Sequence, residues 1–292
     1  MIPLPRRLEK WLRDATPLSR TDVREAVSQG CVRLSYGTGE RLARLADLDH
    51  FIFASDQVWL DGDEQTLRRT QRTWLLHKPA GVVCTMRDPN GVADLSEFCA
   101  TLPRGAQPVG RLDRDTSGAL LFTTDGDLAN ALLKPHHRIE KAYGLWVAST
   151  VALDDARLAS MRRGVDTARG CLRVARVHVV RHHSSLEVRP DGVASELEVV
   201  LTEGKNRQLR RICYAVGFRL LQLHRHRIAH LELGELEPRC SRRVSPEDVE
   251  RLWGAVGGRA YVRLRQRIAL ERSAHTHTRL RRWLAEHPGP TT

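Results

Sequence analysis

The chain has 292 residues, 41% of them hydrophobic, and a formal net charge of +12. This length allows more than one domain, and the apolar fraction is sufficient for a buried core. No stretch approaches the ~18 consecutive apolar residues of a membrane helix, and the opening MIPLPRRLEK lacks the apolar segment of a secretory signal. The positive charge is typical of a protein that binds a polyanion, although an arginine-rich genomic composition is an alternative cause.

Cysteine, histidine and glycine patterns exclude several kinds of site. The six cysteines stand far apart without a C-x-x-C pair, and the thirteen histidines lack the H-E-x-x-H or Cys-paired context of a zinc enzyme. Neither G-x-G-x-x-G nor G-x-x-x-x-G-K-[ST] occurs, so no phosphate-binding loop is expected. We therefore expect reduced thiols, surface histidines, no metal, and a cytoplasmic protein.

The first predicted domain covers residues 5–64. The periodic pattern RRLEKWLRDA indicates one short helix, and Ser19 with Asp22 forms a potential capping box, so a second helix is expected from Arg20. The apolar side chains of this second helix share one face, at Val23, Ala26 and Val27. Gly30 is expected to end it, and CVRL to begin a strand.

Several basic side chains of this domain are expected to face solvent and to suit contact with a phosphate backbone. They are Arg7, Lys10, Arg20 and Arg24. The polar run DGDEQTLRRTQR at 61–72 then favours a linker, which we bound at 65–72.

Residues 73–255 interleave predicted strands and helices. Strands are expected at TWLLHK, GALLFTT, KAYGLWVA, CLRVARVHVV, ELEVVLT and FRLLQLHRHRI, with a turn at Asp125-Gly126 after the second. Helices are expected at DLANALLK, which ends before Pro135, and at NRQLRRICYAVG. The apolar face of the latter contains Leu209, Ile212, Cys213 and Val216. The order predicts an α+β domain around a mixed sheet, followed by an arginine-rich extension at 256–292.

Three charged motifs stand on this scaffold: GRLDRDTSG, EKAYG and EGKNRQLRR. Singly, each has an ordinary structural interpretation such as capping, core packing or a solvated helix face. In this order, after HKPAG, they resemble the pseudouridine synthases. The N-terminal RLEKWL and SRTDVREAVSQGCVRL resemble an S4 RNA-binding domain, which points to the RsuA/RluF branch that modifies ribosomal RNA.

The resemblance covers about residues 5–253 and contains mild departures. Thr124 stands where Asn is common, Leu145 where Val is common, and Arg239 follows Pro238 where Gly is usual. The run LSYGTG replaces the usual Asn-Gly turn of the S4 domain. None of these departures removes a catalytic group.

The resemblance implies a small S4-like α/β RNA-binding domain and a synthase domain on a mixed, largely antiparallel sheet with a central cleft. It implies isomerisation of a specific uridine of ribosomal RNA, within a stem-loop or an assembly intermediate, by a monomer without a membrane partner. No cofactor is expected, because replacing the N1–C1′ bond by a C5–C1′ bond changes neither redox state nor atom count.

The same resemblance assigns roles to individual residues. Asp113 attacks C1′ or removes a C2′ proton, Arg210 keeps that carboxylate ionised, and Tyr143 stacks on the base or acts as general base. Further substrate contacts are expected from Arg111, Leu209, Lys141, Lys205 and Arg207.

Two other functions compete with this one. The first is a catalytically inactive S4-type ribosome-associated RNA-binding protein, which loss of Asp113, Tyr143 or Arg210 would have favoured. The second uses Asp113 and Asp115 as a glycosidase pair. Both carboxylates then stand on one short segment, which is awkward for flanking a single bond.

Overall fold

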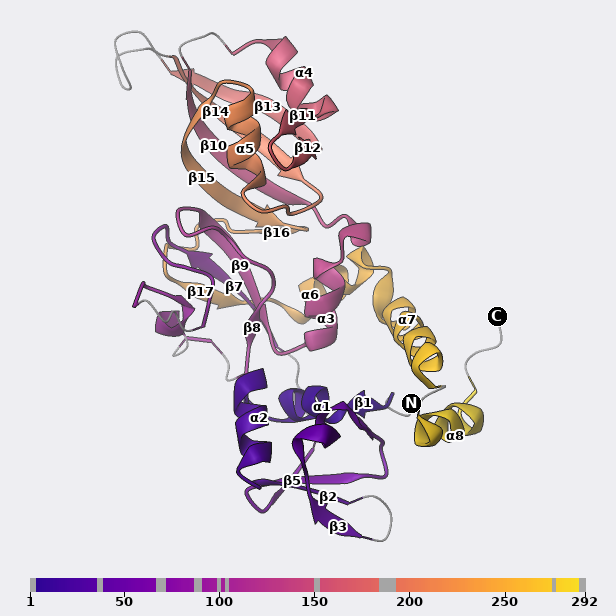
Figure 1. The fold of residues 1–292 in the computed structure, drawn as a ribbon. Coiled ribbons are helices and arrows are strands. Elements are labelled where there is room, and N and C mark those ends of the chain that lie inside the picture. Colours follow the sequence, from indigo (N-terminus) through magenta and orange to yellow (C-terminus); the bar gives the residue numbers. More distant parts are fainter. Residues whose placement is uncertain are drawn as a thin grey trace.

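The computed structural model describes residues 4–35, 39–66, 72–86, 91–98, 101–102, 105–149, 153–183, 193–274 and 277–288. Three parts follow one another along the chain: a small N-terminal domain, a larger domain on a curved sheet, and a C-terminal pair of helices (Figure 1). None of the described helices is long and apolar enough to cross a membrane.

The N-terminal domain combines two short helices with small antiparallel sheets, as the sequence predicts. Its helices are α1 (Leu8–Ala15) and α2 (Arg20–Ser28). Four strands pair in the order β3-β2-β5-β6, with bounds β2 (Val32–Ser35), β3 (Glu40–Leu42), β5 (Gln57–Leu60) and β6 (Asp63–Gln65). The remaining elements are the pair β1 (Arg6–Arg7) and β4 (Phe51–Ile52), and the 3₁₀ helix η1 (Leu45–Asp49).

Helix α2 begins where the capping box predicts. The Ser19 hydroxyl accepts a hydrogen bond from the Asp22 backbone N–H, and the Asp22 carboxylate accepts one from the Ser19 N–H. Val23 and Val27 are buried in the domain core, and Ala26 packs against it. The predicted apolar face is therefore correct.

The polar run at 61–72 is only partly a linker. Asp61 and Gly62 have φ angles of 53° and 91°, which are the left-handed values that a two-residue hairpin turn requires. Strand β6 consequently pairs back onto β5 inside the domain. Most of the expected linker, residues 67–71, and the centre of the LSYGTG turn, residues 36–38, lie outside the described residues.

The larger domain is built on a nine-stranded sheet with main order β13-β14-β10-β15-β9-β7-β17. Its strands are β7 (Thr73–Lys78), β8 (Gln107–Pro108), β9 (Ser117–Thr123), β10 (Lys141–Ser149), β13 (Arg176–His183), β14 (Val193–Leu201), β15 (Arg219–Ile228), β16 (Leu231–Glu232) and β17 (Ser241–Arg243). Strand β9 runs parallel to β15, and the other pairings are antiparallel. The expected α+β class and largely antiparallel sheet are confirmed.

Helices cover this sheet on both faces. They are α3 (Gly126–Leu133), α4 (Asp155–Arg163), α5 (Gln208–Ala215) and α6 (Pro246–Ala255), with 3₁₀ helices η2 (Leu95–Phe98) and η3 (Pro135–His137). Helix α5 packs Leu209 and Ile212 into a core shared with β10, whereas α3 and α6 pack into a second core. Strand β9 contributes Leu120 to the first core and Leu121 to the second, as expected of a strand buried on both faces.

Two local expectations differ from the structure. The run CLRVARVHVV is not one strand: β12 (Gly170–Leu172) pairs with β11 (Val165–Thr167), and β13 begins only at Arg176. Asp125 is not simply a turn residue, because its carboxylate caps α3 by accepting hydrogen bonds from two backbone N–H groups.

The C-terminal extension folds back onto the N-terminal domain. Helix α7 (Gly258–Ser273) continues from α6, and α8 (Thr278–Glu286) lies beside the N-terminal domain (Figure 1). Leu280 and Trp283 of α8 form an apolar cluster with Phe51 and Phe53. The extension therefore links the two ends of the chain.

Candidate active site

The loop that carries Asp113 is fixed mainly through its backbone. The Gly81 N–H donates to the Arg114 carbonyl at 2.8 Å, and the Leu112 N–H donates to the Cys84 sulfur at 3.2 Å. At the end of this loop Gly118 has a φ of 110°, and a Cβ there would lie 2.2 Å from the carbonyl oxygen of Arg225. Only glycine permits this approach of β9 to β15.

Asp113 faces an arginine brought from helix α5. Its Oδ2 lies 3.7 Å from Nε of Arg210, and both side chains are partly buried, with exposed fractions of 28% and 20%. The guanidinium group of Arg210 thus faces the Asp113 carboxylate, and both residues line the same cavity. Asp115 is exposed and contributes its backbone oxygen, which accepts a hydrogen bond from Nη2 of Arg210 at 3.3 Å.

These groups border a cavity of about 480 Å³. Tyr143 of β10, 8% exposed, and Leu209 of α5, 3% exposed, supply its apolar wall. Seven of the eight predicted catalytic and substrate-binding residues line this cavity: Arg111, Asp113, Tyr143, Lys205, Arg207, Leu209 and Arg210. Asp115 is not among the lining residues, which favours Asp113 as the reactive carboxylate.

Lys141 is placed differently from the other predicted substrate contacts. It does not line the cavity, and its Nζ donates to the carbonyl of Ile139 at 3.2 Å. Burial, with a smaller effect from the charge of Arg225, lowers the pKa of Lys141 to about 8. Its expected contact with substrate remains a prediction.

Lys78 is a buried cation whose role the sequence did not reveal. It is fully buried, and its ammonium group donates to the carbonyls of Pro79 and Val82 at 2.7 Å and of Arg114 at 3.3 Å. Burial lowers its pKa. The lysine of the HKPAG motif thus ties the turn after β7 to the loop that carries Asp113.

Arg225 is a second group that sequence reasoning missed. Although it lies on β15 it is only 3% exposed, and its Nε donates to the Ala119 carbonyl at 2.7 Å. Its guanidinium carbon lies 5.9 Å from the centre of the Tyr143 ring. The alternating pattern of FRLLQLHRHRI was the available signal, because it places an arginine among inward-facing positions.

The histidines are not all surface groups. His224 of β15 is partly buried, its Nδ1 lies 2.9 Å from the Ser117 hydroxyl, and burial with nearby His77 and His226 lowers its pKa to about 4. Across the described ranges no three His, Cys, Asp or Glu side chains gather as a metal site. The described cysteines are free thiols, and Cys99 lies outside the described residues.

The predicted RNA-contact residues of the N-terminal domain all have carboxylate partners. Lys10 pairs with Asp127 of α3 at 2.7 Å. The other pairs are Arg7 with Asp49, and Arg20 and Arg24 with Glu9. Lys10 therefore lies at the junction between the domains, whereas the three arginines stay more exposed, at 46% to 66% of their side-chain surface.

Comparison with known proteins agrees with this site. A family model described as RNA pseudouridylate synthase matches residues 72–215, which contain Asp113, Tyr143 and Arg210. The ribosomal large subunit pseudouridine synthase B of Bacillus subtilis strain 168 is 31% identical over 247 residues, covering 84% of this chain and 95% of that protein. The chain belongs to the RNA pseudouridylate synthase family.

Other similar proteins extend this result. The enzyme of the same name from Escherichia coli strain K12 is 33% identical over 239 residues, covering 80% of this chain and 77% of that protein. A crystal structure of a pseudouridylate synthase superposes with a TM-score of 0.53 at 23% identity, covering 86% of this chain and all of that one. The family and the synthase fold predicted from the ordered motifs are confirmed, and the protein is an RNA pseudouridine synthase, an isomerase.

Proposed function

We propose that this synthase converts a uridine of ribosomal RNA into pseudouridine with Asp113 as the reacting carboxylate. The observation that carries this assignment is the approach of Asp113 Oδ2 to Arg210 Nε, 3.7 Å, at a cavity that Tyr143 lines. The names of the similar proteins from Bacillus subtilis and Escherichia coli support a large-subunit ribosomal RNA substrate.

The reaction needs an ionised carboxylate in a cavity that excludes water. Asp113 attacks C1′ while the N1–C1′ bond breaks, or removes the C2′ proton as that bond breaks; both routes free the uracil to rotate. The C5–C1′ bond then forms; in the first route the bond from Asp113 to C1′ breaks as it does so, and in the second Asp113 returns the proton to C2′. C5 loses its proton and N1 gains one, so that pseudouridine and the free carboxylate result. The hydroxyl of Tyr143 is suited to accept the C5 proton, and Leu209 helps keep out the water that would hydrolyse the intermediate.

The Asp113–Arg210 pair supports this role without a fully formed hydrogen bond. Within the described residues Nε of Arg210 has no hydrogen-bond partner, and catalytic pairs often tighten only when substrate binds. The target uridine must first leave its RNA stack, at a cost of a few kcal/mol. Arg111, Lys205 and Arg207 at the cavity supply positive charge that offsets this cost by binding phosphate.

The N-terminal domain, which we propose to be of the S4 type, would add affinity for the RNA. Its exposed Arg7, Arg20 and Arg24 are suited to phosphate contact. The protein would act as a monomer on a stem-loop or an assembly intermediate. No step of the isomerisation requires a cofactor.

A transcript of large-subunit ribosomal RNA tests the proposal. Nucleosides from the treated RNA are separated by chromatography, because pseudouridine has the mass of uridine. Asp113→Asn should lower the rate by about three orders of magnitude or more, with RNA affinity and unfolding midpoint unchanged. The matched variant Asp115→Asn should stay active.

Each competing function predicts a different result. Release of free uracil by the wild type would identify a glycosidase, and RNA binding without any product would identify an inactive binding protein. Full activity of Asp113→Asn with loss in Asp115→Asn would transfer the reactive role to Asp115.

A further inference from the structure

A second hollow, of about 590 Å³, lies in the synthase domain beside the catalytic cavity. Segments far apart in sequence contribute basic side chains to it: His136 and Arg138 from η3 and its end, Arg162 from the last turn of α4, and Arg173 from the connection between β12 and β13. The loop from β14 to α5 completes the wall. The fold thus gathers positive charge at a place that no catalytic motif marks.

The arginines of this hollow are not neutralised by acids. Among the described residues none of Arg138, Arg162 and Arg173 forms an ion pair, and Arg162 makes only a long hydrogen bond, 3.4 Å, to the Val177 carbonyl. The carboxylate in the wall, Glu203, is already engaged. It lies 3.6 Å from Nζ of Lys205 and accepts a hydrogen bond from Gln208 at 2.9 Å.

The positive field extends to the C-terminal extension. The side chain of His137, next to the hollow, stacks edge-on against Tyr261 of α7 at 6.1 Å. Burial, followed by the nearby His136, Lys134 and Arg265, lowers the pKa of His137. Arg265 of helix α7 therefore adds positive charge near His137 and the hollow.

The hollow and the catalytic cavity are bordered by consecutive residues of the loop from β14 to α5. Thr202 and Glu203 line the hollow, whereas Gly204 and Lys205, the next residues, line the cavity. Gln208 of the cavity also donates to the carbonyl of Arg173 at 2.9 Å. An RNA strand whose uridine enters the cavity would therefore have its neighbouring nucleotides close to the hollow.

We propose that this hollow holds backbone phosphates of the RNA strand beside the flipped uridine, with Arg162 and Arg173 as the contacts. The inference rests on the proposed function and adds a strand-positioning site to it. One guanidinium group can donate two parallel hydrogen bonds to the oxygens of one phosphate. Phosphate contacts fix the register of a nucleic acid strand without reading its sequence. Among the described residues that line the hollow there is no glycine to form the backbone cradle of a nucleotide site, and no Phe, Tyr or Trp on which a base would stack, so a continuous backbone is the ligand that it fits.

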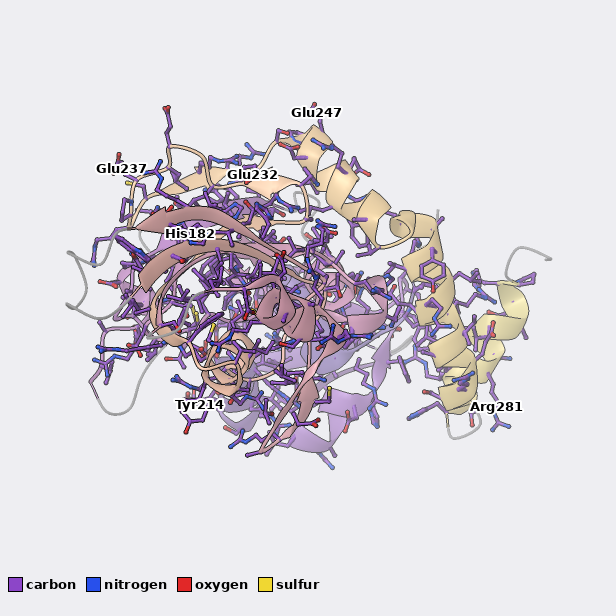
Figure 2. The ribbon with its side chains drawn as sticks, turned by 90° about the horizontal axis from the view of Figure 1, so that it is seen from above. His182, Tyr214, Glu232, Glu237, Glu247 and Arg281 are labelled. Atoms are coloured by element: carbon purple, nitrogen blue, oxygen red, sulfur yellow. The ribbon has the colours of Figure 1, made fainter. Side chains whose placement is uncertain are left out.

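The test uses the full chain with both charges removed, Arg162→Gln with Arg173→Gln. Glutamine keeps a long polar side chain, and both positions are exposed, so the unfolding midpoint should not change. The matched control is Arg281→Gln, on the exposed outer part of α8 and away from the sheet (Figure 2). Binding and turnover of a large-subunit ribosomal RNA transcript are measured over a range of salt.

For the double variant we expect KM and Kd to rise about tenfold with kcat within about twofold. The slope of log affinity against log salt should become shallower by about 1.4 to 1.8 units, because each of the two lost phosphate contacts removes about 0.7 to 0.9. The control should match the wild type.

Three results separate the possibilities. An unchanged KM and salt slope in the double variant, with normal wild-type turnover, would overturn the inference. A loss about half as large in Arg281→Gln, which removes one charge where the double variant removes two, would overturn it as well, since the effect would then be one of net charge. If the wild type makes no pseudouridine while the double variant still loses salt slope, the proposed function fails and the hollow stands as an RNA site.

Inorganic phosphate is the competing small ligand. Stabilisation of the wild type by millimolar phosphate, lost in the double variant and without any change in RNA affinity, would replace RNA by a free anion and contradict the inference. We expect phosphate to have no such specific effect, because the arginines come from separate elements and suit successive phosphates of one strand.

Discussion

The segment around Asp113 and the N-terminal domain hold their charged side chains in different ways. The catalytic loop is tied by backbone hydrogen bonds, by the buried ammonium group of Lys78 and by the close approach at Gly118. The N-terminal domain contacts the synthase domain through ion pairs of Lys10 and Arg6 with Asp127. Chemistry requires placement within a fraction of an ångström, whereas phosphate contacts of the kind proposed for the N-terminal domain tolerate adjustment.

The C-terminal extension adds contacts that hold the N-terminal domain in place. Besides the cluster around Trp283, Arg279 of α8 pairs with the buried Asp56 at 2.6 Å and lies over the Phe53 ring at 4.6 Å. Burial of apolar area stabilises more than exposed ion pairs do. We infer that the orientation of this domain depends on α8 as much as on the ion pairs at α3.

The largest effect is expected where the catalytic loop meets α5. Arg210→Met should lower kcat by about 10²- to 10³-fold, because the Asp113 carboxylate loses the guanidinium group that faces it and holds it at the cavity. Arg210→Lys should recover only part of the rate, since the planar fork is lost. Single-turnover kinetics on the ribosomal RNA transcript measures both, and full activity in both variants would show that the pairing is irrelevant.

A smaller effect is expected from the N-terminal arginines. The combined change Arg7→Gln, Arg20→Gln and Arg24→Gln should raise KM by about threefold to tenfold and flatten the salt slope by about 2 units, with kcat unchanged. The loss is limited because Glu9 and Asp49 already pair with these arginines, so RNA must displace existing partners.

The matched control for this variant is Arg281→Gln on α8. A salt slope that stays at the wild-type value in the triple variant would show that the synthase domain and its extension hold the RNA alone. That result would limit the RNA contacts to the synthase domain and its extension, and would leave the assignment of Asp113 unchanged.

The sequence predicted which side chains meet at the cavity better than it predicted the framework around them. The resemblance of the three ordered motifs to the pseudouridine synthases predicted that Asp113, Tyr143 and Arg210 share one site, and all three line one cavity. The hydrogen-bond partners of Lys78 and Arg225 could not be predicted, because they depend on the parallel pairing of β9 with β15 and on which carbonyls the folded loops present. The alternation in FRLLQLHRHRI could indicate only that Arg225 faces inward.

The N-terminal domain and the C-terminal extension also show that local signals could be predicted and long-range contacts could not. The capping box gave the start of α2, since it is a local signal, whereas the docking of α8 on Phe51 and Phe53 joins residues more than two hundred positions apart. The arginine-rich composition of the extension predicted only its charge, and the apolar face of α8, with Leu280 and Trp283, was not predicted. Local chemistry is thus readable from the sequence, and long-range packing is not.

Acid should weaken the region next to the catalytic loop through His224. Its pKa in the folded protein is about 4, below the unfolded value of about 6.5. The unfolded chain therefore binds more protons between these values, so stability is complete above about pH 6.5 and decreases as the pH falls towards 4. His224→Gln should reduce this decrease in urea unfolding, whereas His136→Gln, at an exposed position, should not. Equal pH dependence in wild type and His224→Gln would refute this cause.

The smallest effect is expected at the junction between the domains. Burial alone would raise the pKa of Asp127, yet the charges of Lys10 and Arg6 outweigh it and lower that pKa. The carboxylate is 15% exposed and Lys10 is 42% exposed, so a double-mutant cycle of Asp127→Asn with Lys10→Met should give a coupling energy of about 1 kcal/mol.

The matched cycle uses Arg7 and Asp49, an ion pair inside the N-terminal domain with side chains 46% and 80% exposed. Its coupling energy should be close to zero, because solvent screens exposed charges. Both cycles are measured by urea unfolding above pH 6, where Asp127 is ionised and its contribution is fully present; the contribution is lost as the pH falls through the lowered pKa. A coupling of several kcal/mol at Asp127 would mean that the junction is held as tightly as the catalytic loop, and the contrast between the two regions would then be wrong.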